Sequence, residues 1–337
     1  MKIDLEKFSI ENKDSNFQIN LNPEIEVPKF LYKYYYLNKN SLDVVKNETV
    51  HFSHSFTMND LMDGSFMLWD VDDFLNQHMR EKNIPKLMKM QCHKELLRIL
   101  SDEFLKYIGI FCVCDNYSND LFWTHYTNES GYCVEINTQS LLDSLKEYKP
   151  YFFPINYGEL NQIKFFEYCV TRMSNGQKIY DANIPIYYTL SNKEKFWNYE
   201  NEWRLIIRNE GFEKVSNPQV MISEEQKNFE NESLKKRNIK ISNSIIEKVI
   251  LATVFFNNKR FSSREFDNMK VKYFFSLNDE KENLRDFLKT LKNKFNDRVF
   301  QIDKYLKDGK VIRDIQYKID ILTINDDCVE IQRTTVY

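Results

Sequence analysis

The pattern of apolar and polar residues along the chain predicts a mixture of strands and helices. Apolar runs and alternating segments, which are typical of strands, occur at 30–37, 49–56, 108–114, 132–136, 202–208 and 247–256. Apolar residues at helical spacing follow Pro85 and recur at 141–148, 164–173 and 283–295. A further helix and strand are expected to complete the core near Leu277. We therefore expect an α+β fold with a mixed or largely antiparallel central sheet flanked by helices.

Local patterns add detail to some of these elements. Ser41 is placed to cap a short helix that runs through Val45. Alternation in the strand at 49–56 puts four side chains on one face: Val50, Phe52, His54 and Phe56. Alternation at 202–208 directs Trp203, Leu205 and Ile207 to the core, with Glu202, Arg204 and Arg208 on the opposite face.

Composition changes along the chain predict three segments. Residues 1–29 are polar, are punctuated by Pro23 and Pro28, and are expected to form a loose or strap-like arm. Residues 30–278 form the main α+β domain, and within them Met221 to Asn243 is a charged stretch expected to be a solvated helix or loop. Residues 279–337 form an appendix with an amphipathic helix and two strands. The two strands are expected to pair as a hairpin around Asn325-Asp326-Asp327.

Overall composition narrows the class of protein. The 337 residues are 42% hydrophobic and 15% aromatic, which is enough to bury a large core. A formal net charge of -3 provides no electrostatic footprint for nucleic acid over the whole chain, although a local basic patch is compatible with it. The start, MKIDLEKFSI, has acidic residues where a signal peptide needs an apolar run, and the apolar segments are too short to span a membrane. We expect a cytoplasmic protein that makes no membrane contact.

Several well-known chemical motifs are missing from the sequence. Its seven glycines form neither a dinucleotide-binding nor a P-loop pattern, and no GxSxG or HExxH occurs. The six cysteines follow no paired zinc spacing, and Cys112 and Cys114 are expected to fill the core of a buried strand. These absences disfavour Rossmann enzymes, kinases, α/β-hydrolases and zincins, and we predict no metal site.

Four polar and aromatic clusters remain as candidates for chemistry. They are Tyr32-Lys33-Tyr34, Asn59-Asp60 with Asp63, Trp123-Thr124-His125-Tyr126, and the run from Trp197 to Arg204. Each also has a purely structural interpretation. Glu202 and Arg204 could be a surface ion pair, Asn59-Asp60 an Asx-turn or helix cap, and His125 a satisfied half-buried histidine. The tryptophans and tyrosines could equally be core aromatics.

In this order, the motifs resemble a bacterial family catalogued as domain of unknown function 2971. The family has a Tyr-Lys-Tyr strand, a phenylalanine-containing loop ending in Asn-Asp, Trp-x-x-Tyr before Gly, and Trp-x-x-Glu-x-Glu-Trp-Arg. The corresponding residues are Tyr32 to Tyr34, Phe56 to Asp60, Trp123 to Tyr126 with Gly131, and Trp197 to Arg204. The resemblance covers roughly residues 30–277. This chain departs from the family at Tyr35, where Arg is frequent, and at Leu61, where Pro is usual.

The order of polar elements is more remotely similar to that of the ADP-ribosyltransferase superfamily, which holds NAD in a split sheet without a glycine-rich loop. The resemblance implies that Glu202 or Glu200 is the catalytic carboxylate, that Tyr126 or Tyr34 stacks on nicotinamide, and that His125 and Lys33 contact phosphate or ribose. Arg204 would keep Glu202 ionised. The wider NAD-binding set comprises Tyr32, Lys33, Tyr34, Asn59, Asp60, Trp123 and Arg204.

The function expected from this resemblance is an NAD-dependent ADP-ribosyltransferase-like effector of bacterial phage defence or toxin biology. NAD would be the substrate, and the acceptor would be a protein or a nucleic acid. Two alternatives remain open. One is metal-dependent phosphoester or nucleic-acid chemistry, in which Asp60, Asp63, Glu200 and Glu202 would supply oxygen ligands to Mg²⁺. The other is a non-enzymatic sensor or binding module of a defence system. The oligomeric state stays undetermined.

Overall fold

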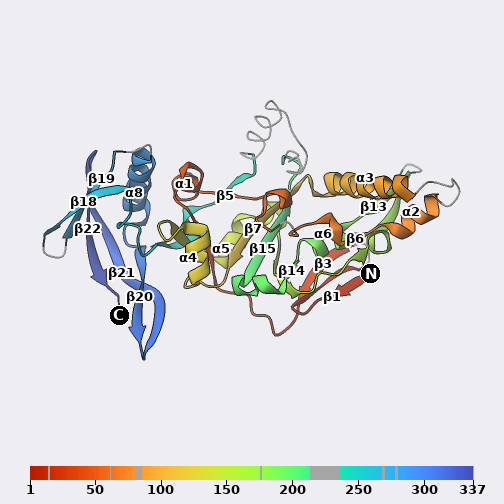
Figure 1. Ribbon diagram of the computed structural model, residues 1–337, viewed down its shortest axis with the longest axis horizontal. Coiled ribbons are helices and arrows are strands. Elements are labelled where there is room, and N and C mark those ends of the chain that lie inside the picture. Colours follow the sequence, from red (N-terminus) through yellow and green to blue (C-terminus); the bar gives the residue numbers. More distant parts are fainter. Residues whose placement is uncertain are drawn as a thin grey trace. The chain divides into compact units, whose positions relative to one another are not determined.

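Two units, each assembled from three separate chain segments, make up the protein. The computed structural model describes residues 1–13, 16–60, 62–79, 86–174, 177–212, 236–267, 270–277 and 280–336 (Figure 1). Unit 1 contains Met1–Val27, His51–Cys112 and Tyr148–Asn238, and unit 2 contains Pro28–Val50, Val113–Glu147 and Ile239–Tyr337. Three strands contribute residues to both units: β5 (Thr49–His51), β7 (Ile108–Cys114) and β16 (Asn238–Lys240). Each unit is described by itself.

Unit 2 is built on a mixed sheet with the strand order β18-β19-β22-β21-β20-β17-β8-β4. The strands in chain order are β4 (Phe30–Tyr35), β8 (Tyr132–Asn137), β17 (Ile246–Leu251), β18 (Phe261–Asp267), β19 (Lys270–Phe275), β20 (Val299–Lys307), β21 (Lys310–Ile324) and β22 (Cys328–Thr335). Neighbours are antiparallel except β17 and β20, which are parallel. The helices are α1 (Lys39–Lys46), α4 (Asp120–Thr127), α5 (Thr138–Ser144) and α8 (Lys281–Phe295).

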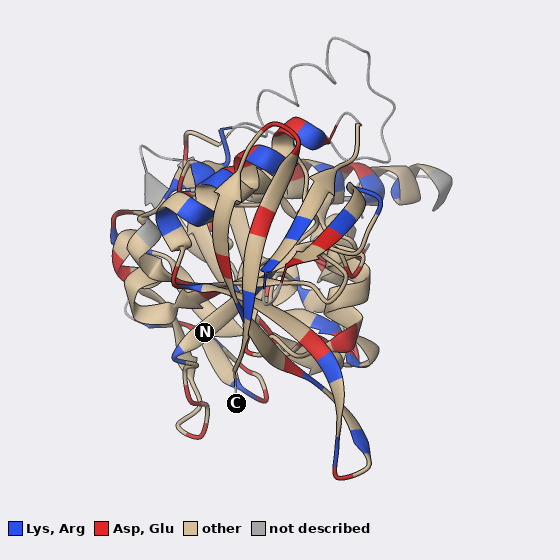
Figure 2. Ribbon diagram, turned by 90° about the vertical axis from the view of Figure 1, so that its left-hand side faces the viewer, with Lys and Arg blue, Asp and Glu red and all other residues tan. Residues whose placement is uncertain are grey.

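Helix α8 is amphipathic and packs against this sheet. Its buried side chains, spaced three and four residues apart, are Leu284, Phe287, Leu288, Leu291 and Phe295. The ring of Phe287 lies 4.7 Å from that of Tyr132 on β8. The predicted helix and C-terminal hairpin are confirmed, because β21 and β22 pair and Asn325 Oδ1 accepts hydrogen bonds from the amides of Asp327 and Cys328. On the face drawn in Figure 2, basic and acidic residues are interspersed over strands and helices.

Unit 1 combines several small sheets around one apolar core. Strand β15 (Glu202–Arg208) lies between β7 and the antiparallel β9 (Tyr151–Pro154). Parallel pairs join β10 (Asn156–Gly158) to β14 (Asn192–Glu194) and β6 (Trp69–Asp70) to β11 (Ile163–Lys164), and β12 (Val170–Ser174) pairs with β13 (Gln177–Asp181). The helices are α2 (Asp72–Met79), α3 (Lys86–Leu105) and α6 (Asn183–Thr189). The core includes Trp69, Ile110, Phe153, Phe165 and Leu190.

The expectation of a loose N-terminal arm is wrong. Strands β1 (Lys2–Asp4), β2 (Phe8–Lys13) and β3 (Asn16–Leu21) form an antiparallel sheet in unit 1. Phe8 and Ile10 are fully buried in the core, where the ring of Phe8 lies 5.3 Å from that of Phe153. The alternation of these few apolar residues within a polar segment is the strand signal that the composition concealed.

The α+β class is confirmed, as are the strands β4, β7, β8, β15 and β17 and the long helix α3. Other expectations about elements are wrong. Residues 164–173 form a 3-10 turn (Phe165–Tyr168) and β12 instead of a helix, and the helix expected near Leu277 is replaced by the β18–β19 hairpin. The strand at 49–56 ends at His51. Asn38 caps α1, and Ser41 is the third helical residue of a capping box.

Some expectations concern residues outside the described ranges. These are Pro85 at the start of α3, Leu61, residues 221–235 of the charged stretch and Asp279 at the expected boundary. Within the described residues, no helix is both long and apolar enough to cross a membrane.

Candidate functional site

Five charged side chains meet in the interior of unit 1. Arg204 on β15 donates to both carboxylate oxygens of Asp63, at 2.7 and 2.5 Å, and its Nε donates to Glu202 Oε1 at 2.5 Å. Lys193 Nζ donates to Glu202 Oε2 at 2.5 Å and to Glu200 Oε2 at 2.8 Å, and lies 3.6 Å from Asp63. All five residues are at most 6% exposed. We call this group the ion network.

Mutual attraction keeps Glu202 and Lys193 charged despite their burial. Burial alone would raise the pKa of Glu202, but Arg204 and Lys193 outweigh it and hold the pKa of that carboxyl well below its usual range. Burial would likewise lower the pKa of Lys193, but Glu202, Asp63 and Glu200 raise it above its ordinary value. Three carboxylates therefore face two cations, and Glu202 is a fixed anion at any physiological pH.

The ion network joins Asp63 to four residues of one later stretch, 193–204. Asp63 follows the loop 59–60, Lys193 lies on β14, and Glu200 ends a 3-10 turn, Lys195–Glu200. Asn201, in the left-handed conformation at φ 42°, then turns the chain into β15. The interpretation of Glu202 and Arg204 as a surface ion pair is wrong, because both faces of β15 are covered. Residues from two of the four sequence clusters thus meet in one buried group.

An aromatic surface adjoins the ion network on the same 3-10 turn. The ring of Trp197 lies 5.1 Å from that of Phe196 and 6.0 Å from that of Tyr199. Lys193 Nζ lies 5.6 Å from the centroid of the Trp197 ring. Phe196 is 63% exposed. The turn therefore presents the Phe196 ring to solvent, with the partly buried Trp197 and Tyr199 beside it.

The loop at 59–60 has a mainly structural role. Asp60 Oδ1 accepts the amide of Met62 at 2.9 Å, so the Asx-turn interpretation of Asn59-Asp60 is confirmed for Asp60. Asn59 is exposed. Asp60 Oδ2 and Trp197 Nε1 are buried, and neither makes a hydrogen bond within the described part of the chain. Buried polar atoms of this kind are usually satisfied by water or by a ligand.

The other two sequence clusters lie together in unit 2. The ring of Tyr34 on β4 packs edge-on against Phe122 and Trp123 of α4, with centroids 5.1 Å away in both cases. The hydroxyl of Tyr34 donates to the carbonyl of Asn116. Tyr32 donates to Glu135 on β8 at 2.9 Å. Both tyrosines are buried, which matches the alternative of a structural aromatic face.

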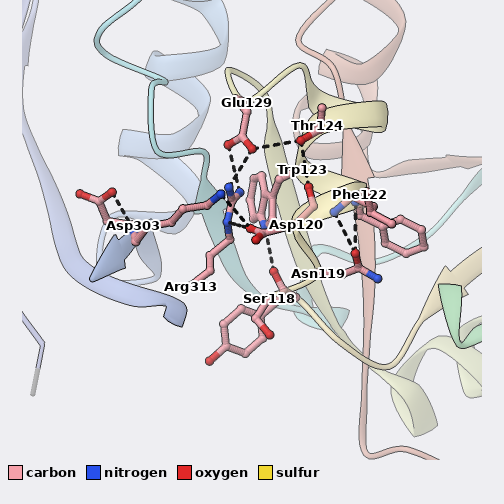
Figure 3. Close-up of polar contacts among 12 residues, drawn as sticks. Ser118, Asn119, Asp120, Phe122, Trp123, Thr124, Glu129, Asp303 and Arg313 are labelled. Carbon is pink, nitrogen blue, oxygen red and sulfur yellow. Dashed lines mark hydrogen bonds and ion pairs between the residues drawn. The ribbon is translucent and has the colours of Figure 1, made fainter. Parts of the chain in front are cut away.

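The cluster Trp123 to Tyr126 lies on helix α4. Its Trp123 is fully buried and donates through Nε1 to the carbonyl of Tyr117. Arg313 of β21 holds Glu129 at 3.0 and 2.7 Å and Asp120 at 2.6 Å, in front of the Trp123 indole (Figure 3). His125 is exposed, whereas Tyr126 and Lys33 are partly buried. The candidate residues of unit 2 are thus a packed aromatic group with an exposed histidine beside it.

Three of the four carboxylates proposed for Mg²⁺, Asp63, Glu200 and Glu202, are already engaged with cations. Asp63 and Glu202 each use both oxygens on Arg204 or Lys193, so a metal ion would have to displace them. In the described part of the chain, no group of three or more His, Cys, Asp or Glu residues is arranged to hold a metal ion. The geometry does not favour the metal-dependent alternative.

The sequence did not predict some residues that complete the ion network of unit 1 and the aromatic group of unit 2. Lys193 is the central cation of the ion network, and the Tyr157 hydroxyl accepts the backbone amide of Glu202 at 2.8 Å. In unit 2, Glu135 and Arg313 were missed. The sequence pattern did not indicate Lys193, because a lysine within a polar run is normally exposed to solvent. Glu135, by contrast, interrupts the apolar strand YCVEI, and such an interruption could have marked it.

Comparison with known proteins gives one finding. Residues 122–205 match the model of a family described as protein of unknown function (DUF2971). This stretch is about a quarter of the chain and contains Trp123 to Tyr126, Gly131 and the run from Trp197 to Arg204. The match supports the resemblance to that family over this segment. No curated protein and no solved structure gives a significant match.

Proposed function

We propose that this protein is an NAD-dependent ADP-ribosyltransferase-like enzyme with its catalytic carboxylate in the ion network of unit 1. One observation supports the proposal: the exposed aromatic turn leads directly into two buried glutamates, Glu200 and Glu202. Nicotinamide in NAD is a cationic aromatic ring, which suits the faces of Phe196 and Trp197. A carboxylate beside that ring is placed to stabilise the positive charge that develops on the ribose.

The reaction needs few protein groups. The bond between the nicotinamide nitrogen and ribose C1′ breaks, and nicotinamide leaves with the bonding electron pair. An acceptor nucleophile then bonds to C1′ and loses its proton. The protein's contribution is a fixed anion near C1′ and a surface that orients the leaving ring.

Glu200 is the better candidate for that anion. Both oxygens of Glu202 are held in ion pairs, so Glu202 acts as a positioning residue that fixes Lys193 and Arg204. Glu200 binds Lys193 through Oε2 and is the last residue of the aromatic turn. This assignment uses unit 1 alone. Tyr34 and Trp123 are then packing residues, and His125 has no required role.

The test combines binding and turnover. NAD is expected to raise the melting temperature of the wild-type protein in proportion to the logarithm of its concentration, because it binds the folded state. Phe196→Ala should weaken this effect without unfolding the protein, since the side chain is exposed. Glu200→Gln should leave the NAD-induced shift in place and reduce nicotinamide release by about 100-fold or more, the scale of losing one electrostatic stabiliser.

Glu194→Gln is the matched control, because it makes the same chemical change on a half-exposed residue just before the turn. It should leave the NAD-induced shift of the melting temperature and the rate of nicotinamide release unchanged. Equal nicotinamide release by wild type and Glu200→Gln, or no response to NAD in folded protein, would contradict the proposal.

A second candidate is a non-enzymatic binding module, and the burial of all five charged residues of the ion network favours it. Buried ion pairs often fix one conformation without taking part in chemistry. Under this alternative Glu200→Gln lowers the melting temperature, and NAD has no effect on any variant. The same experiment therefore separates the two candidates.

A further inference from the structure

A small pocket in unit 2 has the features of an anion site. It lies between the first residues of α1 and of α8 and is lined by Asn38, Lys39, Arg260, Glu280 and Asn283, together with two leucines. Its volume is about 100 Å³. A pocket of this volume accommodates a group of a few heavy atoms.

Arg260 is the central polar group of this pocket. It is 3% exposed, and its Nη2 donates to the carbonyl and the hydroxyl of Ser130 at 2.8 and 2.9 Å. Its guanidinium also lies 5.5 Å from the ring centroid of Phe255. Nη1 is buried and makes no hydrogen bond in the described residues. A buried guanidinium N–H without an acceptor is costly, so this atom indicates an acceptor that the described residues do not supply.

The start of α8 offers further hydrogen-bond donors. This helix has 15 residues, and its N-cap residue Glu280 makes no side-chain capping hydrogen bond. The first amides of a helix have no intrahelical partner, and the helix dipole makes this end positive. Asn283, in the first turn of α8, also lines the pocket. Backbone amides and a positive dipole are what phosphate groups bind at helix N-termini.

One carboxylate opposes these donors. Glu280 Oε2 lies 3.7 Å from Arg260 Nε, which is an ion-pair distance but longer than a hydrogen bond, and its side chain is 40% exposed. Glu280 therefore partly neutralises Arg260 from the rim of the pocket. An incoming anion with more charge and more oxygens can compete with it for the guanidinium.

We infer that this pocket binds a phosphate group, which Arg260, Lys39 and the amides at the start of α8 hold in competition with Glu280. A phosphate matches the guanidinium fork, carries more charge than a carboxylate and fits the volume. The inference concerns a site in unit 2 and does not depend on the reaction proposed for unit 1. Free phosphate and the phosphoryl group of a monoester are the two sources of this chemistry.

The experiment is a calorimetric titration of the full chain with inorganic phosphate and with phenyl phosphate at matched ionic strength, with chloride as the reference anion. Tighter binding of inorganic phosphate indicates that the free ion is the ligand, and tighter binding of phenyl phosphate indicates a monoester. Equal weak responses to phosphate and chloride would overturn the inference.

Substitutions in the pocket are expected to change the phosphate affinity in opposite directions. Glu280→Gln removes the competing carboxylate and should tighten phosphate binding by about tenfold. Arg260→Lys keeps the charge but loses the fork, and binding should fall by about tenfold or more. Lys39→Ala should weaken binding by about two- to fivefold, as expected for one exposed charge.

Lys289→Ala is the matched control for Lys39→Ala, because it removes the same charge from an exposed position farther along α8. It should leave the affinity unchanged. If Arg260→Lys does not fold, Glu280→Gln and Lys39→Ala still decide the matter, since neither side chain is buried. Weaker binding by Glu280→Gln, or equal effects of the two lysine variants, would overturn the inference.

Discussion

His54 illustrates how one buried titratable residue links the local backbone to stability. It is 2% exposed and caps a 3-10 turn, with Nδ1 accepting the amide of Phe56 at 3.1 Å. Burial, reinforced by the positive charge of Arg237, lowers the pKa of His54 to about 3. The acceptor role of Nδ1 requires the unprotonated ring. Protonation would therefore charge a buried group and break its hydrogen bond together.

The resulting prediction is a loss of stability in mild acid. The folded pKa lies below the unfolded value of about 6.5, so the unfolded state binds more protons at any pH between about 3 and 6.5. The free energy of unfolding should then fall as pH drops below 6.5, by up to roughly 1.4 kcal/mol per pH unit from this group. His54→Asn retains a capping acceptor but cannot titrate, and should flatten the dependence.

Urea unfolding at pH 7.5, 6 and 5 checks this prediction, because few carboxylates titrate in that range. The variant is expected to be less stable at pH 7.5, where it loses the ring packing against Phe56. Its shortfall should shrink toward pH 5. Parallel loss of stability in both proteins would show that His54 is not the group responsible.

At the residue scale, the sequence predicted which side chains interact better than it predicted whether they are buried. Alternation correctly placed Glu202 and Arg204 on one face of a strand, and they do interact. Burial was not predictable, because Asp63, which binds Arg204 on that face, comes from a distant segment, and Lys193 lies on a separate strand. Periodicity reports the face of an element, while tertiary contacts decide what covers it.

At the element scale, the turn between α4 and β8 depends on a glycine for close approach. A Cβ added at Gly131 would lie 2.0 Å from the carbonyl oxygen of Tyr35 and 3.0 Å from Thr127 Cβ. Gly131 also accepts the amide of Ala252 and donates to the carbonyl of Thr127, so the backbone is held on both sides. The clash is with backbone and cannot be relieved by a rotamer change.

Gly131→Ala should therefore lower the free energy of unfolding by about 3 kcal/mol, at the high end for overpacking. Gly158→Ala is the matched control, because an added Cβ at Gly158 meets no atom within 4 Å. It should change stability by less than about 1 kcal/mol. Thermal and urea unfolding of the two variants make the comparison. Similar stability would mean that the loop around Tyr35 yields more easily than its hydrogen bonds suggest.

Element types were predictable where the apolar pattern was strong and failed where it was weak. The runs at β7, β15 and β17 and the stripe of α8 were identified. The failures were segments with few apolar residues, such as β1 to β3, or with mixed patterns, such as 164–173. In those segments pairing with a neighbouring strand, and not local preference, decides the structure.

At the scale of the whole molecule, sequence order and spatial organisation differ. Each unit draws on three separate segments, so neither unit can form until distant parts of the chain meet. The expected appendix at 279–337 supplies β20 to β22 and α8 to the sheet of unit 2. In this sheet β20 pairs with β17, and β22 pairs with β19. The composition along the chain does not show which distant segments pair in one sheet.

This arrangement predicts the effect of a truncation. A chain ending at Leu277 would leave β17 and β19 without these neighbours and would expose Tyr132 and Phe255, both fully buried against α8. We expect unit 2 to lose its cooperative unfolding transition, since exposed apolar surface and open strand edges both favour aggregation. Trp123 is the tryptophan of unit 2, so its fluorescence, read in a protein whose other tryptophans are replaced by phenylalanine, follows this unit directly.

The control shortens the same segment without touching the core. Leu306 pairs with Val311 at the tip of the β20–β21 hairpin, and both are largely exposed. Replacing residues 306–311 with Asn-Gly preserves the register of Tyr305 opposite Ile312 through a two-residue turn. That variant should unfold like the wild type. A truncated chain with wild-type stability would instead show that residues 30–278 fold as a self-contained domain, with the last strands added to a sheet that does not need them.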